Sequence, residues 1–434
     1  MRFSCISSTI DRLFWFLRSE RGRSRPLGRP SAKSSTWNLV DGEEVESVVI
    51  VGGGVIGLCI AYNLAKEAGK SEKVPRRNIT VLEAASSTFP ASSSHNTGCL
   101  HYVFPEPFGE DITPLGKYSY ELWRSVAEEH LQFNADTGYR ANSFYPVVPG
   151  EGRGINALPN WIEPQKDWDI DWEQSGPACA TVGLGIWLER ECVTEGVDIR
   201  TSTTATGVAS AENGTLKSVQ CSILATGESY SLPCQKLVIA AGPWSPSLIQ
   251  SLFPNSTLDL QPSTNAADWM VFQNLNPVTA DTTSVVFFDD IVHEKLEYGG
   301  RNNGSIFVCG RRNFTATLPP PGKEDEPDKI VLSDLIQYSR RFIHQDIEAG
   351  ACPALPIQEK GRSFRPSTVT GLPLISEIPS EKLSRVESEV PTDVFLCYGH
   401  GSYGLTLGMG SGKLMAQVIL GLKPDIDISK FTLS

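Results

Sequence analysis

Three glycines and one glutamate near the start of the chain have the residue types and the spacing that bind a dinucleotide. Gly52, Gly54 and Gly57 stand at G-x-G-x-x-G spacing, and Glu83 ends the next apolar segment. The first glycine permits a tight turn, the second lets the backbone approach a pyrophosphate, and the third allows a helix to pack closely on a strand. The carboxylate of Glu83 can accept hydrogen bonds from a ribose diol.

The elements predicted around these residues are those that a dinucleotide site requires. The apolar, β-branched residues 48–51 predict a buried parallel strand, and apolar residues recur on one helical face over 56–64. Val55 and Ile56 begin this helix, so their N–H groups and the positive end of the helix dipole face the phosphates. Residues 79–83 predict a second strand that ends in the acid. A glycine turn without a ligand is the alternative, and the complete strand–turn–helix–strand context disfavours it.

Length, charge and cysteine spacing restrict the class of protein. A chain of 434 residues exceeds a single core, which stops growing near about 250–300 residues, so two domains are expected. The net charge of −12 disfavours a nucleic-acid partner. No apolar run reaches the ~18 residues that a transmembrane helix needs. The ten cysteines are scattered without paired spacing, which is typical of reduced thiols in an intracellular protein.

The first 45 residues differ in composition from the rest of the chain. They are rich in serine and arginine, and basic residues outnumber acidic ones. This composition predicts a basic, disordered extension, with a mitochondrial transit segment as the alternative. The expected location is therefore the cytoplasm, or the mitochondrion if the extension is a transit segment.

The remaining chain alternates between α/β and β-rich patterns. Residues 235–241 predict an apolar strand that ends at the Gly242 turn, and residues 394–398 predict another before a glycine-rich turn. Short apolar runs separated by turn residues predict β structure over 261–313. Helices are expected over 115–133, 332–347 and 411–422. We predict an α/β fold in which a discontinuous, Rossmann-like nucleotide-binding domain is combined with a β-rich α+β substrate-binding domain. The expected boundaries are 46–115, 178–260 and 350–434 for the first domain, and 116–177 and 261–349 for the second.

Four motifs together resemble the D-amino-acid-oxidase-like superfamily of FAD-dependent oxidoreductases. The first is the glycine motif with Glu83. The second, SSHNTGCLH over 93–101, is similar to a segment of L-2-hydroxyglutarate dehydrogenases, and the third, over 237–244, is similar to the family strand that ends in A-x-G-x-W. The fourth combines Arg365 with GHGSYGLT over 399–406, and this octet is close to that of D-amino-acid oxidases.

The resemblance covers residues 46–434, is nearest to a fungal-type subgroup, and implies FAD as the cofactor. In the family, N–H groups of the C-terminal glycine turn and of the following helix lie near the flavin O2, where a helix terminus stabilises an anionic reduced flavin. The FAD-binding residues implied here are Gly52, Gly54, Val55, Ile56, Gly57, Glu83, Ser93, Ser94, His95, Asn96, Gly98, Val208, Gly242, Gly401, Gly404, Leu405 and Thr406. Non-covalent FAD is expected, with a histidyl linkage at His95 as the alternative.

On the substrate side, Arg365 stands where the family has a carboxylate-binding arginine. A bidentate guanidinium–carboxylate pair supplies both charge and geometry, and Arg362 is a second candidate for this role. His101, Tyr403 and His400 complete the expected catalytic set, because a histidine can act as general base for a hydroxy acid. For His400 a structural role is an equal alternative. We therefore expect a carboxylate-bearing small-molecule substrate and no metal.

The chain also departs from the family in its expected substrate region. Residues 261–312 lack the paired tyrosines of typical D-amino-acid oxidases, and carry Asp289-Asp290 and His293-Glu294 instead. The leading hypothesis is oxidation of a CH–NH group by hydride transfer to flavin N5, with electrons passing to O2. The segment 93–101 favours an alternative, a 2-hydroxy-acid dehydrogenase. The departure favours a third hypothesis, a flavin-binding regulatory or trafficking protein with little turnover.

Overall fold

In the computed structural model of the chain, Val45–Ser434 form a compact unit. The residues that the structure describes are 46–70, 77–104, 109–180, 183–211, 214–273, 284–292, 294–301, 303–345, 355–384 and 392–433. The extension predicted for residues 1–45 lies outside them. None of the helices in the described ranges combines the length and the apolar character needed to cross a membrane.

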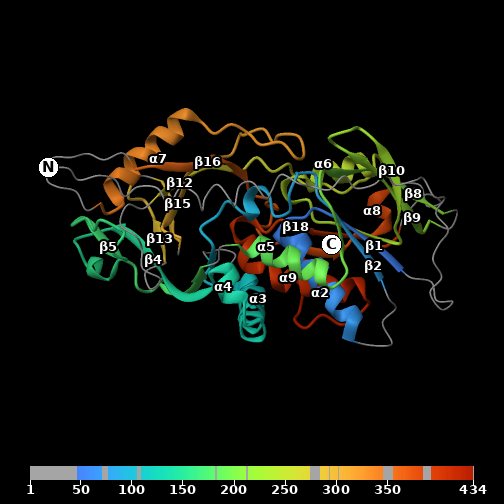
Figure 1. Ribbon diagram of the computed structural model, residues 1–434, viewed down its shortest axis with the longest axis horizontal. Coiled ribbons are helices and arrows are strands. Elements are labelled where there is room, and N and C mark those ends of the chain that lie inside the picture. The colour runs from blue at the N-terminus through green and yellow to red at the C-terminus, as the bar shows by residue number, and fades with distance from the viewer. Residues whose placement is uncertain are drawn as a thin grey trace, which may run out of the picture. The chain divides into compact units, whose positions relative to one another are not determined.

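A largely parallel sheet forms one half of this unit (Figure 1). Within the described residues it has six strands, in the order β17 (Leu374–Glu377), β18 (Val394–Tyr398), β11 (Lys236–Ile239), β1 (Glu46–Val51), β2 (Arg77–Leu82) and β7 (Asp198–Arg200). All neighbours are parallel except β17, which pairs antiparallel with β18. The apolar, β-branched sequence of β1 suits its central position, because both faces of this strand are buried.

Alternate side chains of β1 reach two different cores. Val48 and Ile50 belong to a core formed with α2 (Val55–Lys70) and α9 (Gly404–Ile419), whereas Val49 and Val51 belong to a core on the opposite face. The period of two along a strand causes this division. The second core is completed by β8 (Thr203–Ser210), β9 (Leu216–Ile223), β10 (Ser229–Pro233) and α6 (Ser245–Leu252). The parallel sheet is therefore the middle layer of three.

A second large sheet is mostly antiparallel and contributes the other half of the unit. Its order is β16 (Ile357–Phe364), β12 (Ala266–Gln273), β15 (Ser305–Asn313), β14 (Leu296–Gly300), β13 (Val285–Phe288), β4 (Arg140–Pro149), β6 (Gly176–Ala180) and β3 (Cys99–Leu100), with β5 (Trp168–Ile170) paired to β4. Helix α7 (Lys329–Phe342) covers β12 and β15 (Figure 1) and buries Leu335 and Phe342 in their core. The carboxylate of Asp328 accepts N–H groups at the start of α7 and so defines where the helix begins.

The two sheets confirm the predicted fold class. The predicted domain boundaries stay a prediction. Two strands that the sequence assigns to the nucleotide-binding domain pair in the antiparallel sheet: β3 pairs with β6, and β16 pairs with β12. The remaining helices are α3 (Gly109–Glu129), α4 (Phe133–Thr137), α5 (Leu184–Thr194) and α8 (Ser380–Leu383). The expected helix over 115–133 is thus two helices, and α9 begins at Gly404 where the sequence predicts a start at 411.

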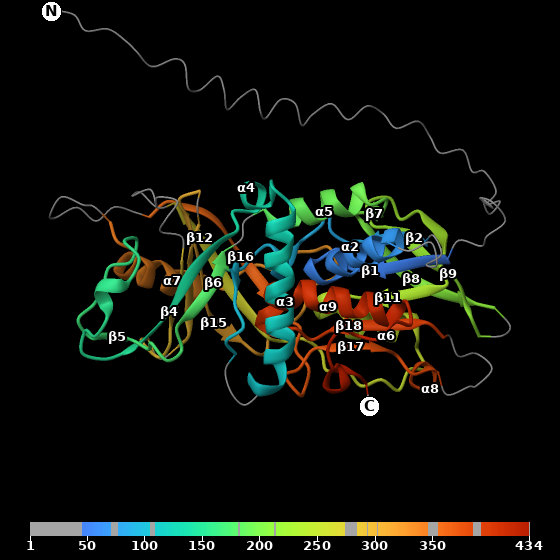
Figure 2. The same ribbon diagram turned by 90° about the horizontal axis from the view of Figure 1, so that it is seen from below.

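The early start of α9 follows from its contacts, which override the weak helix propensity of glycine. Gly408 and Gly412 face α2, where an added Cβ would lie 2.9 Å from Cγ2 of Val55 and 2.5 Å from the carbonyl carbon of Cys59. On another side, α3 crosses α9 and packs against it (Figure 2). The Ser119 hydroxyl of α3 donates to the Thr406 carbonyl at 2.6 Å and accepts the Gly410 N–H at 2.8 Å, so it enters the hydrogen-bond ladder of α9.

We expect Gly412→Ala to destabilise the protein, because the new methyl group would overlap the backbone of α2. Overpacking of this kind costs about 1–3 kcal/mol, which corresponds to a melting temperature lower by several degrees. Gly404→Ala is the matched control on the same helix, since its Cβ would meet only carbons at 3.8 and 3.9 Å. Thermal unfolding of the two variants measures the difference, and equal melting temperatures would contradict the close helix contact.

Candidate functional site

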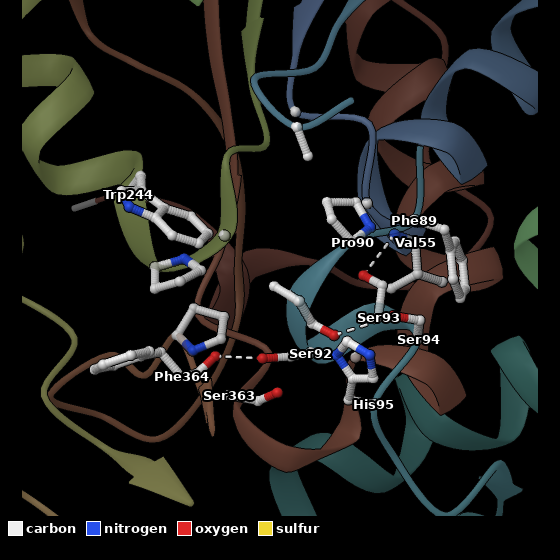
Figure 3. A pocket seen from close by; sticks show the side chains of 18 of the residues that line it. Val55, Phe89, Pro90, Ser92, Ser93, Ser94, His95, Trp244, Ser363 and Phe364 are labelled. Carbon is white, nitrogen blue, oxygen red and sulfur yellow. Dashed lines mark hydrogen bonds between the residues drawn. The ribbon is translucent and has the colours of Figure 1, made fainter. Parts of the chain in front are cut away.

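A cavity of about 1330 Å³ lies at the carboxyl ends of β1, β11 and β18 and extends to the antiparallel sheet. It exceeds the range of about 300–1,000 Å³ that is usual for drug-sized ligands, so it has room for an extended molecule. Its lining includes Gly52, Gly242 and Gly401, which are far apart in the sequence. Figure 3 shows Ser93, His95, Trp244 and Phe364 around this space.

The glycine motif forms the tight turn that the sequence predicts. Gly52 has φ +115°, and an added Cβ would lie 2.3 Å from the Ala240 carbonyl oxygen of the neighbouring strand. An added Cβ on Gly57 would lie 1.8 Å from the Gly52 carbonyl oxygen, so this position admits no side chain. The Val55 N–H at the start of α2 donates to the Ser93 hydroxyl at 3.0 Å (Figure 3). The loop that follows β2 therefore crosses the N-terminus of α2.

Glu83 is buried at the end of β2 and is held by backbone groups. Its Oε2 accepts the Gly53 N–H at 2.8 Å, and its Oε1 accepts the Ala85 N–H at 2.8 Å. Burial raises the pKa of Glu83, and the backbone N–H groups around the carboxylate oppose this rise. These bonds fix the carboxylate at the rim of the glycine turn, where it lines the cavity.

The small polar segment after Glu83 connects the two halves of the unit. Ser92 donates its hydroxyl to the Phe364 carbonyl at the end of β16, and Arg301 donates to the Asn96 carbonyl at 2.9 Å. The His95 ring stacks on Trp269 of β12, with 4.0 Å between ring centroids. Burial lowers the pKa of His95. The segment thus lies between the N-terminus of α2 and the antiparallel sheet.

The C-terminal glycine turn meets the segment that contains Arg365. The Gly401 N–H donates to the Pro366 carbonyl at 2.7 Å, and Gly399 has φ +88°, with an added Cβ only 2.4 Å from Cγ2 of Thr368. His400 is buried in this turn and its Nε2 lies 3.0 Å from the Ser411 hydroxyl. Burial lowers the pKa of His400 to about 3, so the ring is neutral at neutral pH.

Two of the expected catalytic residues, His101 and Tyr403, lie off the cavity lining, whereas Arg365 and His400 are part of it. His101 is enclosed by aromatic rings, including Phe144 at 5.0 Å and Tyr403 at 6.2 Å between centroids. Burial lowers the pKa of His101 to about 4 and raises that of Tyr403 to about 12.

The two candidate arginines have different surroundings. Arg362 pairs with both oxygens of Asp268 at 2.7 and 3.1 Å, and with Asp325 at 3.0 Å. Arg365 has a buried Nη1 without a hydrogen-bond partner among the described residues, and its Nη2 lies 4.0 Å from the Cys309 sulfur. The charge of Arg362 is therefore balanced within the fold. A bound anion is what would balance the charge of Arg365.

The cavity lining brings together most of the expected FAD-binding residues. Those in the lining are Gly52, Gly54, Val55, Ile56, Glu83, Ser93, Ser94, His95, Asn96, Gly242, Gly401, Gly404 and Leu405. Those outside it are Gly57, Gly98, Val208 and Thr406. Gly57 and Thr406 still contribute to the geometry, because Gly57 closes the turn and Thr406 is bound by Ser119. Val208 lies further along β8 than Thr203–Thr206, which face the cavity in its place.

The sequence did not indicate three lining features. Trp269 and Glu297 are on strands of the antiparallel sheet, where no local motif marks them. Residues 319–327, which we name the strap, also line the cavity. The Trp244 indole donates to the Pro319 carbonyl at 2.7 Å, and Gly322 lies against the Ala84 carbonyl. The many proline and charged residues of the strap predict a loop, but they do not indicate that this loop lies against the cavity.

Comparisons with known proteins agree with this geometry. A family model described as FAD dependent oxidoreductase, DAO, matches residues 47–418. A Schizosaccharomyces pombe protein named for an oxidoreductase activity is 24% identical over 400 residues, which cover 86% of this chain and 94% of that protein. A glycine oxidase of Bacillus licheniformis is 22% identical over 418 residues, which cover 86% and 92%. The crystal structure of glycine oxidase from Geobacillus kaustophilus has a TM-score of 0.66 at 17% identity, over 90% of this chain and 99% of that one, which is a likeness of fold.

We expect Arg362→Met and Arg365→Met to differ in stability. Loss of Arg362 leaves the buried Asp268 without its cation, which costs about 3–5 kcal/mol. Loss of Arg365 removes a charge that has no anionic partner within hydrogen-bond distance among the described residues, so the free energy of unfolding should stay within about 1 kcal/mol of the wild type. Urea unfolding of both variants makes the comparison. An equal loss in the two would show that Arg365 is also a structural residue.

Proposed function

The chain belongs to the DAO family of FAD-dependent oxidoreductases, and we propose that it oxidises the CH–NH group of an amino acid or secondary amine that carries a carboxylate. Molecular oxygen is the proposed electron acceptor. The observation that carries this proposal is Arg365, a cation in the cavity lining whose buried Nη1 has no acceptor in the part of the chain that the structure describes. A substrate carboxylate would supply that acceptor through a charged hydrogen bond worth about 1.5–3 kcal/mol.

The lining residues fit an extended dinucleotide. When bound, FAD supplies the hydride acceptor, N5 of its flavin ring. We assign the pyrophosphate to the N-terminus of α2, because Gly54, Val55 and Ser93 line the cavity there and a helix N-terminus favours an anion. The Glu83 carboxylate would bind the ribose. Gly401 to Leu405 would lie against the flavin, where the N-terminus of α9 favours negative charge.

The histidines favour an amine substrate over a 2-hydroxy acid. Oxidation of a hydroxyl group requires a base to take its proton, whereas a neutral amine is already competent for hydride transfer. Burial lowers the pKa of His101 to about 4 and that of His400 to about 3, which makes both weak bases, and His101 is outside the cavity lining. The Bacillus licheniformis relative is named a glycine oxidase, which also supports an amino-acid substrate.

We propose that the FAD is held without a covalent bond. The His95 ring is already packed face to face with Trp269. Acid precipitation of the FAD-loaded protein should therefore leave the yellow colour in the supernatant. Colour retained in the pellet, and lost from it in His95→Ala, would instead support the histidyl linkage.

The proposed reaction predicts which compounds reduce the bound flavin. Amino acids and N-methyl amino acids, added without oxygen, should bleach the visible band, and re-aeration should produce hydrogen peroxide. Bleaching by 2-hydroxy acids alone would favour the dehydrogenase alternative. A flavin that no compound in the panel bleaches would favour the regulatory or trafficking alternative.

Arg365→Met provides the matched variant for this panel. It should weaken carboxylate substrates about 10- to 100-fold, the range that a charged hydrogen bond corresponds to, and leave the FAD content unchanged. Unchanged Michaelis constants would remove Arg365 from the substrate site.

A further inference from the structure

Glu297 is a cavity residue to which the proposed function gives no role. It lies on β14, between Phe287 of β13 and Cys309 of β15 in the pairing of the antiparallel sheet. Its carboxylate lines the same cavity as Arg365, close to the C-terminal glycine turn. It therefore belongs to the side of the cavity on which a substrate would meet the flavin.

Glu297 and Arg365 both approach the thiol of Cys309. Oε2 of Glu297 is 3.7 Å from the Cys309 sulfur, and Nη2 of Arg365 is 4.0 Å from the same sulfur. Burial is the main cause that raises the pKa of Cys309, and the Glu297 charge adds to it, so the thiol near the two charged groups is neutral. Among the described residues, no ion pair joins Glu297 to Arg365.

The charges of Glu297 and Arg365 both act on a third residue, Tyr403, so both side chains lie near it. The pKa of Tyr403 is raised to about 12, mainly by burial; the negative charge of Glu297 contributes to this rise, and the positive charges of Arg312 and Arg365 oppose it. Arg312, Asp289 and Lys295 are further charged residues of this region. Asp289 and Lys295 form their own contact at 3.4 Å and are more than a third exposed. Unlike these three residues, Glu297 and Arg365 both line the cavity, and within the described part of the chain no ion pair joins them.

We propose that Glu297 and Arg365 together recognise a zwitterion, with Arg365 binding the carboxylate and Glu297 the ammonium group of the same molecule. The bound ammonium group releases one proton to water before hydride transfer, because only the neutral amine is competent for that step. This inference rests on the proposed function and deepens it. A zwitterionic α-amino acid or N-methyl amino acid has its two charges separated by a single carbon, so it balances both side chains at once. A 2-hydroxy acid balances only Arg365 and leaves the carboxylate of Glu297 in the cavity without a cation. Glu297 is therefore a specificity-determining residue that selects amines over alcohols.

Two ligands of nearly equal shape test this charge recognition without turnover. Trimethylglycine and 3,3-dimethylbutanoate differ by one positive charge, and neither has an N–H or O–H group to oxidise. Titration of each into the FAD-loaded protein, followed by the change in flavin absorbance, gives its dissociation constant. We expect the wild type to bind trimethylglycine at least about tenfold more tightly, because an opposite charge near 4 Å contributes strongly in a partly buried site.

Glu297→Gln should remove this preference, and Asp289→Asn is the matched control that should retain it. Glu297→Gln should also lower kcat/KM for amino acids more than for any 2-hydroxy acid that is turned over. Equal binding of the two ligands by the wild type, or no binding of either, would overturn the proposal and does not depend on any variant folding. An equal effect of Asp289→Asn and Glu297→Gln would also overturn it. If amines still bleach the flavin in those cases, the proposed function stands and only the zwitterion site fails.

Discussion

The close contact between α2 and α9 is the constraint on which the site depends. Gly408 and Gly412 leave α9 without side chains where it meets Val55 and Cys59, so helices from opposite ends of the chain lie at backbone contact. The strands that precede them, β1 and β18, are both parallel to β11, which lies between them. Both helices therefore begin at the same edge of the sheet. Two helix N-termini face one cavity, and each favours negative charge there.

The antiparallel sheet forms the opposite wall of the cavity, and it lines the cavity mainly with side chains. The bond from Ser92 to Phe364 and the bond from Gly401 to Pro366 join this sheet to the two helix N-termini. Each bond links segments that are far apart in the sequence. They set the distance between the charged side chains near β16 and the glycine turns. The strap adds a further link, because Trp244 holds Pro319 over the same cavity.

The parts of the site that the sequence could indicate are those whose requirements are local. A turn such as Gly52 to Gly57 needs glycine for reasons contained in a few neighbouring residues, and the acid at the end of β2 has a fixed place relative to it. The fold class follows from the same periodic patterns and is confirmed. Trp269 and Glu297 carry no such mark, because strand pairing across long sequence separations decides which of their faces meets the cavity. That the lining residues bind FAD stays a prediction.

Arg362 and Arg365 show that a sequence motif can locate two candidate arginines without indicating which of them has an ion-pair partner in the fold. Both are near the end of β16 and both line the cavity, and only their partners distinguish them. The Asp268 and Asp325 carboxylates neutralise Arg362, so its charge stabilises the fold. Arg365 keeps a buried donor without an acceptor, which costs free energy in the absence of a ligand. Local departures of this kind are expected at functional sites, where binding repays them. Glu297 and Arg365 both approach the Cys309 thiol, and no ion pair joins them among the described residues; on our proposal both charges are available to one molecule.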